Sequence, residues 1–343
     1  MFLSDGTDPY YDWSSYIPFK DRPKILNPNK GYLSSANQNP TTKDYPYYLS
    51  EYFAPSYRAN QINIRLDTLY NATINDMIDI QLDNTSLIAK NILPILLELI
   101  EIKDDNYGYD EYWINKLKKW NYQYDKNSDE ATFFDKFVKE IEKKTWGDDF
   151  GNNTDKYIWP EIDKLEELII YDSNSNWFDN KHTKDYIEKL IDICNESFNN
   201  ILSEYLKGLY HNDIKEILNT ENIIKKEVFE KSKNNIKWGN YRGTNINHLA
   251  NIKEFSVLNL KTDGSENIIN ATRKNEGPSF RYIIEMDKPY KIKGIYPGGQ
   301  SGYPGSIYYD NFVQDWVEGK YYDLIFSNNN DFDGIELKCI PNN

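Results

Sequence analysis

The spacing of apolar residues changes near residue 240, and this change limits the fold more than any other feature. From Tyr57 onward apolar residues recur at helical spacing, for example over residues 131–144 and 186–205. After residue 240, short β-branched and aromatic runs alternate with Gly, Pro, Asn and Asp, which is the pattern of strands. These runs are Phe255–Leu260, Ile268–Thr272, Phe280–Met286 and Tyr290–Tyr296, and DKPY between the last two indicates a tight hairpin. Helices grouped centrally and strands grouped at the end predict an α+β fold.

We expect three regions that are parts of one domain. Residues 1–102 form an extended segment, with one short strand near Gly31–Ala36, followed by helices. Residues 103–242 form a helical region and residues 243–343 a β-rich one. The helical signals after residue 70 are a capping box at Thr73–Asp76 and an apolar helix over Leu87–Ile102, which kinks or begins anew at Pro94. Residues Trp316–Phe326 are expected to form a short helix and a tail.

The composition narrows the classes of partner. Hydrophobic residues make up only 39% of the chain, so much of the buried apolar area must come from its 29 Tyr, 15 Phe and 8 Trp. The formal charge of −14 repels phosphate backbones and anionic membranes, so we expect neither nucleic acid nor a membrane as partner. Cys194 and Cys339 are far apart and outside any CxxC motif, which indicates neither a disulfide framework nor a zinc site. The sequence has no signal peptide at its start, so we expect the chain as it stands to be cytoplasmic.

The stretch YPGGQSGYPG at residues 296–305 has three interpretations. A phosphate-binding loop is excluded, because no Lys-Ser/Thr pair follows its glycines. The Gly-Gly-Gln triplet also occurs in the peptide-release loop of translation termination factors, but these dock on RNA, which a charge of −14 disfavours. We favour a sharp turn after the strand that ends at Tyr296, with Gln300 as a turn residue and not a catalyst.

Several longer segments, in the same order, resemble the C-terminal part of the large chain of the penicillin acylase family of N-terminal-nucleophile hydrolases. They are NPNKGYLSSANQNPTTKDYPYYLSEYFAPSYRANQI, INDMIDIQLDNTSLIAKNILPILLELI, WGNYRGTNINHL, GPSFRYIIEMD and GIYPGGQSGYPGSIYYDNFVQDWVEGKYYDLIF. The resemblance covers nearly the whole chain and is weakest between about residues 103 and 235. It implies part of an αββα sandwich with a helical layer. It also implies hydrolysis of an amide by a newly exposed N-terminal Ser, whose own α-amine serves as the base.

Two site residues follow from the resemblance. The family's oxyanion-binding Asn falls on Asn37, and its Arg falls on Arg58, which would orient Asn37 and the amine of the nucleophile. The alternatives are an Asx-turn role for Asn37, the catalytic role for Asn39 instead, and a simple ion pair for Arg58 at a helix start. The chemistry needs no histidine, so we expect His182, His211 and His248 to be surface or packing residues.

Two departures from the family pattern matter. Calcium-containing relatives use an acidic residue between the two motifs, but neither Asp44 nor Glu51 matches it, so we assign no metal and no other cofactor, although calcium remains open for a complete family enzyme. The segment that bears the nucleophile is not in this sequence, and Ser4, in SDG, does not resemble the family's Ser-Asn opening.

The sequence therefore predicts the C-terminal part of an amidohydrolase for linear amides of the acyl or penicillin type. Its partners would be a small-molecule amide and a complementary chain that carries the N-terminal Ser, and this chain alone would be inactive. Substrate-binding residues and the preferred acyl group stay open. The alternative is an inactive, truncated remnant or a non-catalytic binding or structural protein, and the aromatic richness leaves a carbohydrate-binding module open.

Overall fold

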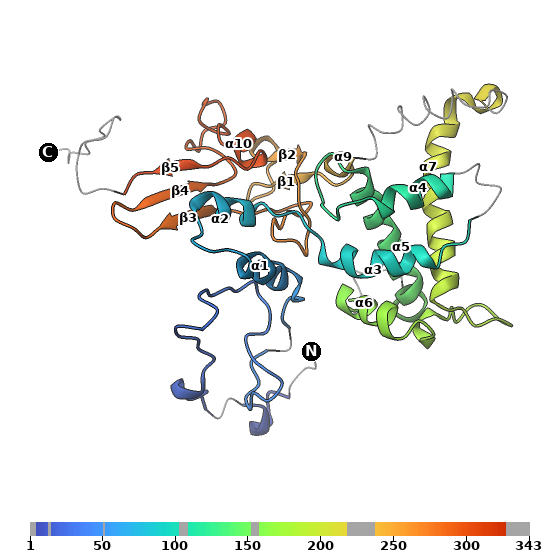
Figure 1. The fold of residues 1–343 in the computed structure, drawn as a ribbon, viewed down its shortest axis with the longest axis horizontal. Helices are drawn as coiled ribbons and strands as arrows, with labels where there is room; N and C mark the ends of the chain where they lie inside the picture. Colours follow the sequence, from blue (N-terminus) through green and yellow to red (C-terminus); the bar gives the residue numbers. More distant parts are fainter. Residues whose placement is uncertain are drawn as a thin grey trace. The chain divides into compact units, whose positions relative to one another are not determined.

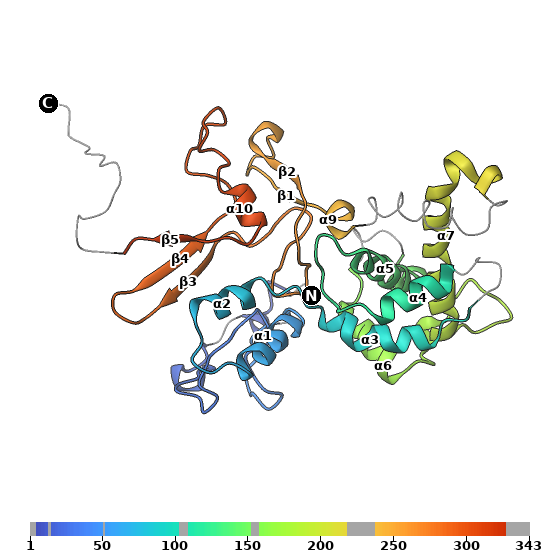
Figure 2. The same ribbon diagram turned by 45° about the horizontal axis from the view of Figure 1, so that its top comes forward.

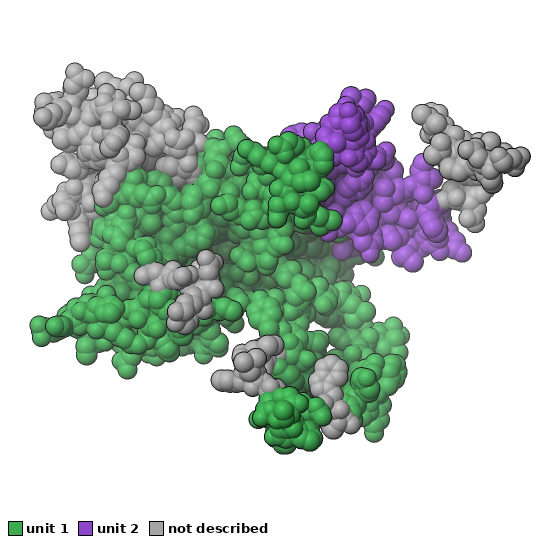
Figure 3. All heavy atoms as spheres, turned by 180° about the vertical axis from the view of Figure 1, so that it is seen from behind, with its two compact units in different colours: residues 1–71, 80–277 green, residues 72–79, 278–343 purple. Residues whose placement is uncertain are grey.

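A computed structural model describes residues 5–12, 15–50, 52–102, 109–151, 158–217 and 237–326 (Figure 1). The fold is α+β, as the sequence predicts. The chain divides into two compact units, shown in different colours in Figure 3. Unit 1 holds residues 1–71 and 80–277, and unit 2 holds residues 72–79 and 278–343.

Unit 1 is mainly helical. Its helices are α1 (Tyr57–Asp67), α3 (Leu87–Glu98), α4 (Tyr109–Lys118), α5 (Asp129–Phe150), α6 (Ile162–Tyr171), α7 (Leu190–Ile217) and the short α9 (Trp238–Tyr241). Short 3-10 turns are η1 (Pro9–Tyr11), η2 (Phe19–Asp21), η4 (Asn176–Phe178) and η5 (Lys253–Phe255). Figures 1 and 2 show α3 to α7 gathered into one layer, in which α5 packs on α7 and α3 packs on α4 and α6. Leu93, Phe133, Phe137, Ile141 and Phe198 are buried between these helices, which confirms the helical prediction.

Helix α3 runs without a break through Pro94. It begins at the N-cap Ser86, whose hydroxyl accepts a hydrogen bond from the Ala89 N–H at 3.1 Å. Pro94 cannot donate to the carbonyl one turn earlier, but it lies on the exposed face of the helix, where water can reach that carbonyl. The helix therefore does not begin anew at the proline. None of the described helices has an apolar stretch long enough to cross a membrane.

The described strands of unit 1 form one antiparallel pair, β1 (Thr244–Ile246) with β2 (Val257–Leu260). The strand predicted at Ile268–Thr272 is wrong. There the Ala271 N–H binds the Ile269 carbonyl, and the Asn270 N–H binds the carbonyl of Asp83, so this backbone bonds locally and to a distant loop. Alternate side chains from 268 to 272 are nonetheless buried, because the loop packs into the unit, and that alternation imitates a strand.

Unit 2 contains a three-stranded antiparallel sheet in the order β3 (Arg281–Glu285), β4 (Lys291–Ile295) and β5 (Tyr322–Leu324). The hairpin between β3 and β4 is confirmed. The tail predicted after the short helix α10 (Val313–Val317) instead contains β5, which pairs with β4. The side chain of Arg281, the first residue of β3, is buried, and its guanidinium donates to the Trp316 carbonyl at 2.8 Å.

Helix α2 (Ile74–Gln81) begins with the predicted capping box. The Asp76 carboxylate accepts from the Thr73 N–H at 2.8 Å, and the Thr73 hydroxyl accepts from the Asp76 N–H at 3.3 Å. These two bonds satisfy donors that the first turn of a helix leaves unpaired.

The glycine stretch at residues 296–305 forms a turn outside any helix or strand. A Cβ atom on Gly299 would lie 2.1 Å from the carbonyl oxygen of Tyr308, so only glycine fits beside that backbone. The neighbouring Ser301 N–H donates to the same carbonyl at 3.0 Å, which closes the loop on itself. This geometry is that of the structural turn favoured from the sequence.

We predict that Gly264→Ala destabilises unit 1. Gly264 has φ +87°, and an added Cβ would lie 2.0 Å from the Asn270 carbonyl oxygen, so the loop would have to shift. Overpacking together with left-handed backbone costs about 2–4 kcal/mol. A lower midpoint of urea unfolding tests this. The matched control is Gly6→Ala, because no atom lies within 4 Å of its Cβ position, and equal midpoints for both variants would contradict the prediction.

Candidate active site

The segment before Asn37 runs antiparallel along helix α1. The Tyr32 hydroxyl donates to Asp67 Oδ1 at 2.6 Å near the end of the helix, and the Ser34 hydroxyl donates to Asn63 Oδ1 at 2.7 Å one turn earlier. The strand predicted near Gly31–Ala36 is wrong, because side chains attach this extended segment to a helix and no described strand pairs with it. The direction of the segment delivers Asn37 to the first turn of α1.

The structure brings Asn37 and Arg58 together. Arg58, in the first turn of α1, donates from Nη2 to Asn37 Oδ1 at 2.9 Å. Asn37 has φ +66°, a conformation that asparagine tolerates better than most residues, and its carbonyl accepts from the Ala54 N–H at 3.0 Å. Because Arg58 only donates, the amide oxygen must face it, and Nδ2 points elsewhere. Within the described residues nothing accepts a hydrogen bond from this Nδ2, and Asn37 is exposed.

The neighbours of Asn37 have local structural tasks. Asn39 Oδ1 accepts from both the N–H and the hydroxyl of Thr41, at 2.9 and 2.7 Å, which is an Asx-turn. Gln38 Oε1 accepts from the Ala36 N–H at 2.7 Å. The turn-forming role considered for Asn37 therefore belongs to Asn39. The ion pair considered for Arg58 is absent from the described part of the chain, where its partner is the neutral amide of Asn37.

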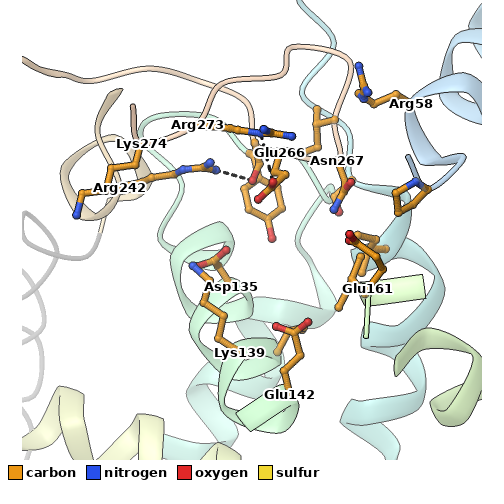
Figure 4. A pocket seen from close by; sticks show the side chains of 18 of the residues that line it. Arg58, Asp135, Lys139, Glu142, Glu161, Arg242, Glu266, Asn267, Arg273 and Lys274 are labelled. Atoms are coloured by element: carbon orange, nitrogen blue, oxygen red, sulfur yellow. Dashed lines mark hydrogen bonds and ion pairs between the residues drawn. The ribbon is translucent and has the colours of Figure 1, made fainter. Parts of the chain in front are cut away.

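Arg58 also lines a pocket of about 850 Å³ in unit 1. One wall is the face of α5 that carries Asp135, Lys139 and Glu142, and Glu161, at the start of α6, lies beside it (Figure 4). Arg242 and the loop over residues 265–276 form the opposite wall. Apolar surface comes from residues that include Ile88, Phe134, Val138 and Ile268. The pocket therefore has charged walls and some apolar lining.

The loop that forms one wall is held by hydrogen bonds at residues 263, 270 and 272. Asp263 Oδ1 accepts from the Lys126 N–H at 2.6 Å, and the Thr272 hydroxyl donates to the Asp263 carbonyl at 2.7 Å. Asn270 Nδ2 donates to Asn84 Oδ1 at 3.0 Å. The loop is thus fixed to segments more than a hundred residues earlier in the chain, which positions its charged side chains.

Burial and neighbouring charges shift the pKa values of charged side chains in the pocket. Burial raises the pKa of Glu142 to about 7; Lys139 opposes this rise, and Asp135, Glu161 and Glu266 add to it. Burial lowers the pKa of Arg58, and the charge of Arg273 lowers it further. Such perturbed groups in a cleft are typical of functional sites, although structural ion-pair networks produce them too.

Comparison with known proteins shows which family the sequence matches. The sequence matches the penicillin amidase family over residues 1–331. The chain belongs to this family. Among curated relatives, the acyl-homoserine lactone acylase QuiP of Pseudomonas syringae pv. tomato is 21% identical over 94% of this chain and 40% of its own length. QuiP of Pseudomonas aeruginosa is 19% identical over 96% of this chain and 41% of its own length. The chain spans about two-fifths of the length of these relatives.

Among the other residues considered from the sequence, none that the structure describes is bonded to the side chains of Asn37 or Arg58. Asp44 is exposed, and the described part of the chain holds no group of three or more His, Cys, Asp or Glu residues that could bind a metal ion. His182 is exposed, and His248 is partly buried against Phe255. Ser4, Glu51, Cys339 and the side chain of His211 lie outside the described residues. Cys194 is buried, and burial raises the pKa of its thiol to about 12.

Most residues of the pocket of this penicillin amidase family member were not predicted from the sequence. Glu142, Arg242 and Arg273 come from segments that are far apart in the chain, and only Arg242 lies inside a segment that resembles the family, WGNYRGTNINHL. A charged residue within a matched segment was the one available signal.

We predict that Glu142→Gln stabilises the chain at high pH. The folded-state pKa of about 7 lies above the usual 4.5, so between these values the folded chain keeps a proton that the unfolded chain has lost. The stability of the wild type therefore falls as pH rises through this window. We expect Glu142→Gln to melt about 2 °C or more above the wild type at pH 8, and close to it at pH 4.

Thermal melts at the two pH values provide the test, with Glu98→Gln as the control, because Glu98 is an exposed residue of α3 outside the pocket. A difference between Glu142→Gln and the wild type that does not change with pH would contradict the prediction.

Proposed function

We propose that this chain supplies the oxyanion-stabilising part of an amidohydrolase that acts on linear amides of the acyl or penicillin type. The nucleophilic N-terminal Ser would come from polypeptide outside this sequence. The observation that carries the proposal is the hydrogen bond from Arg58, a residue of the pocket, to Asn37 Oδ1, which leaves the Asn37 amide nitrogen pointing away from Arg58. Membership of the penicillin amidase family and relatives named as acylases support the same bond class.

The proposed roles follow from the chemistry of amide hydrolysis. When the serine hydroxyl attacks the amide carbon, the carbonyl oxygen becomes negative. The proton of the hydroxyl passes to the free α-amine of the same serine. Asn37 Nδ2 donates to that oxygen, while Arg58 holds the other end of the amide group and adds positive charge nearby. The C–N bond then breaks as the leaving nitrogen takes the proton, and water cleaves the acyl ester. Arg58 is thus a positioning residue and Asn37 a catalytic one.

Exposed apolar side chains on the N-terminal segment support the proposal of a complementary polypeptide. Large apolar side chains there are strongly exposed, with fractions of 85% for Tyr10, 83% for Tyr16, 79% for Phe19 and 85% for Leu26. Burial of such large apolar side chains is favourable, so their strong exposure is consistent with a surface that another polypeptide covers. A chain carrying the N-terminal Ser would bring the nucleophile to Asn37 and can cover this surface.

We predict that Asn37→Ala lowers kcat by about 10²–10³ in the complemented enzyme, because it removes one donor to the oxyanion. KM should change little. The measurement is hydrolysis of a chromogenic acyl anilide by the chain co-expressed with its complementary polypeptide, and the chain alone should give no turnover.

The matched control is Asn39→Ala, two residues away, which removes only an Asx-turn and should retain kcat. Equal losses in both variants, or full activity of Asn37→Ala, would refute the assigned role. If the complemented enzyme hydrolyses no amide, the non-catalytic alternative is favoured instead.

A further inference from the structure

The first turn of helix α1 lacks the side-chain cap that commonly fixes the start of a helix. In the part of the chain that the structure describes, the Ser56 side chain at the N-cap accepts no hydrogen bond from the helix backbone, and the first turn contains no acidic residue. A first turn without such partners frays readily, because its backbone N–H groups have no acceptor within the helix. Arg58 lies in this turn. Its position therefore has to be fixed by other contacts of the helix.

Tyr57, the first residue of α1, makes such a contact. Its side chain is buried, and its hydroxyl donates a hydrogen bond to Glu166 Oε2 on α6. The other oxygen of the same carboxylate, Oε1, accepts from Asn91 Nδ2 on α3 at 2.6 Å. Burial, and then the hydrogen bond to Glu166, raise the pKa of Tyr57, so its hydroxyl keeps its proton and remains a donor. One carboxylate thus connects the first turn of α1 to two other helices, through hydrogen bonds that its charge strengthens.

The contact of Tyr57 also sets the rotation of α1 about its own axis. Arg65 follows Tyr57 by eight residues, so the two side chains share one face of the helix, and Arg65 Nη1 donates to the buried Asp83 carboxylate at 3.1 Å. Arg58 follows Tyr57 by one residue and therefore lies about 100° further round the helix. Because the face that carries Tyr57 is held at both ends, Arg58 is directed to one side of it. There its Nη2 donates to Asn37 Oδ1 at 2.9 Å.

We propose that Tyr57 and Glu166 are positioning residues of the active site. Their hydrogen bond holds the first turn of α1, so that Arg58 keeps the Asn37 amide in the orientation in which Nδ2 reaches the oxyanion. Neither Tyr57 nor Glu166 lines the pocket, so both act through Arg58 and not on the substrate. The inference rests on the proposed function of Asn37 and adds to it the two residues that hold this asparagine indirectly.

Tyr57→Phe tests the proposal, because it removes the hydroxyl and keeps the ring. In the complemented enzyme we expect kcat for the acyl anilide to fall about 10-fold, since misplacement of a catalytic group costs up to about 10²-fold, and KM to change less than about 2-fold. In the Asn37→Ala background the same change should lower kcat no further, because the donor that it positions is already absent. Full kcat in folded Tyr57→Phe, or equal losses in both backgrounds, would overturn the proposal.

Two control variants separate positioning from a general loss of stability. Tyr186→Phe removes a hydrogen bond of the same kind, to Asp192 Oδ1 at 2.9 Å, outside the pocket. Ile193→Val leaves a small cavity at a buried position of α7 and so lowers stability. Both variants should retain kcat. Glu166→Gln keeps an oxygen that can accept from the Tyr57 hydroxyl, so its kcat should stay within about 3-fold of the wild type, whereas Glu166→Ala should lose as much as Tyr57→Phe.

Hydrogen exchange of the 343-residue chain separates this inference from the proposed function, because it needs no turnover. Tyr57→Phe should speed exchange of the backbone amides of α1 at least about 5-fold and leave those of α5 unchanged, since only local opening becomes easier. If exchange changes in this way but the complemented enzyme hydrolyses no amide, the hold of Tyr57 on α1 stands and the proposed function fails. If Asn37→Ala loses kcat while Tyr57→Phe keeps both kcat and slow exchange of α1, the proposed function stands and the positioning role is wrong.

Discussion

The site depends on the hydrogen bonds that the buried carboxylate of Asp83 accepts. It accepts hydrogen bonds from Gln61 and Arg65 of α1, each at 3.1 Å, and from the Thr85 N–H at 2.8 Å. Its backbone carbonyl accepts from the Asn270 N–H at 3.1 Å. A buried charge persists only when it is paired and hydrogen-bonded, so the position of α1 is coupled to the start of α3 and to the loop that forms one wall of the pocket.

Helix α1 then positions the candidate catalytic pair. Its second anchor is the buried Tyr57, which directly precedes Arg58 in the sequence. The Tyr57 hydroxyl donates a hydrogen bond to Glu166 on α6. With α1 held at Tyr57 and Arg65, the N-terminal segment needs only side-chain hydrogen bonds to be placed, and Asn37 reaches Arg58 without any strand pairing. The same helix thus places Arg58 in the pocket and holds Asn37 beside it, although the two residues are 21 positions apart in sequence.

Much of the fold was accessible from the sequence, and the errors share one cause. Periodicity over long segments identified α3, α5 and α7, because a buried helix face repeats over several turns. Short segments failed: residues 31–36 and 268–272 alternate like strands, but one is attached to a helix and the other folds into a loop. Strand β5 was missed because its three residues are all exposed, and its pairing with β4 is a long-range contact that no local pattern encodes.

By itself the sequence determined the α+β class and the family, because these follow from local periodicity and from contiguous motifs, and it predicted Asn37 and Arg58 as candidate site residues. Only the tertiary structure decided that the two side chains meet, that Asn39 takes the turn-forming role, and that Arg58, Arg242 and Glu142 line one pocket. The physical reason is that these relations are distances between segments far apart in the chain. Burial, mutual charge and the choice of hydrogen-bond partner depend on those distances, and the order of residues does not contain them.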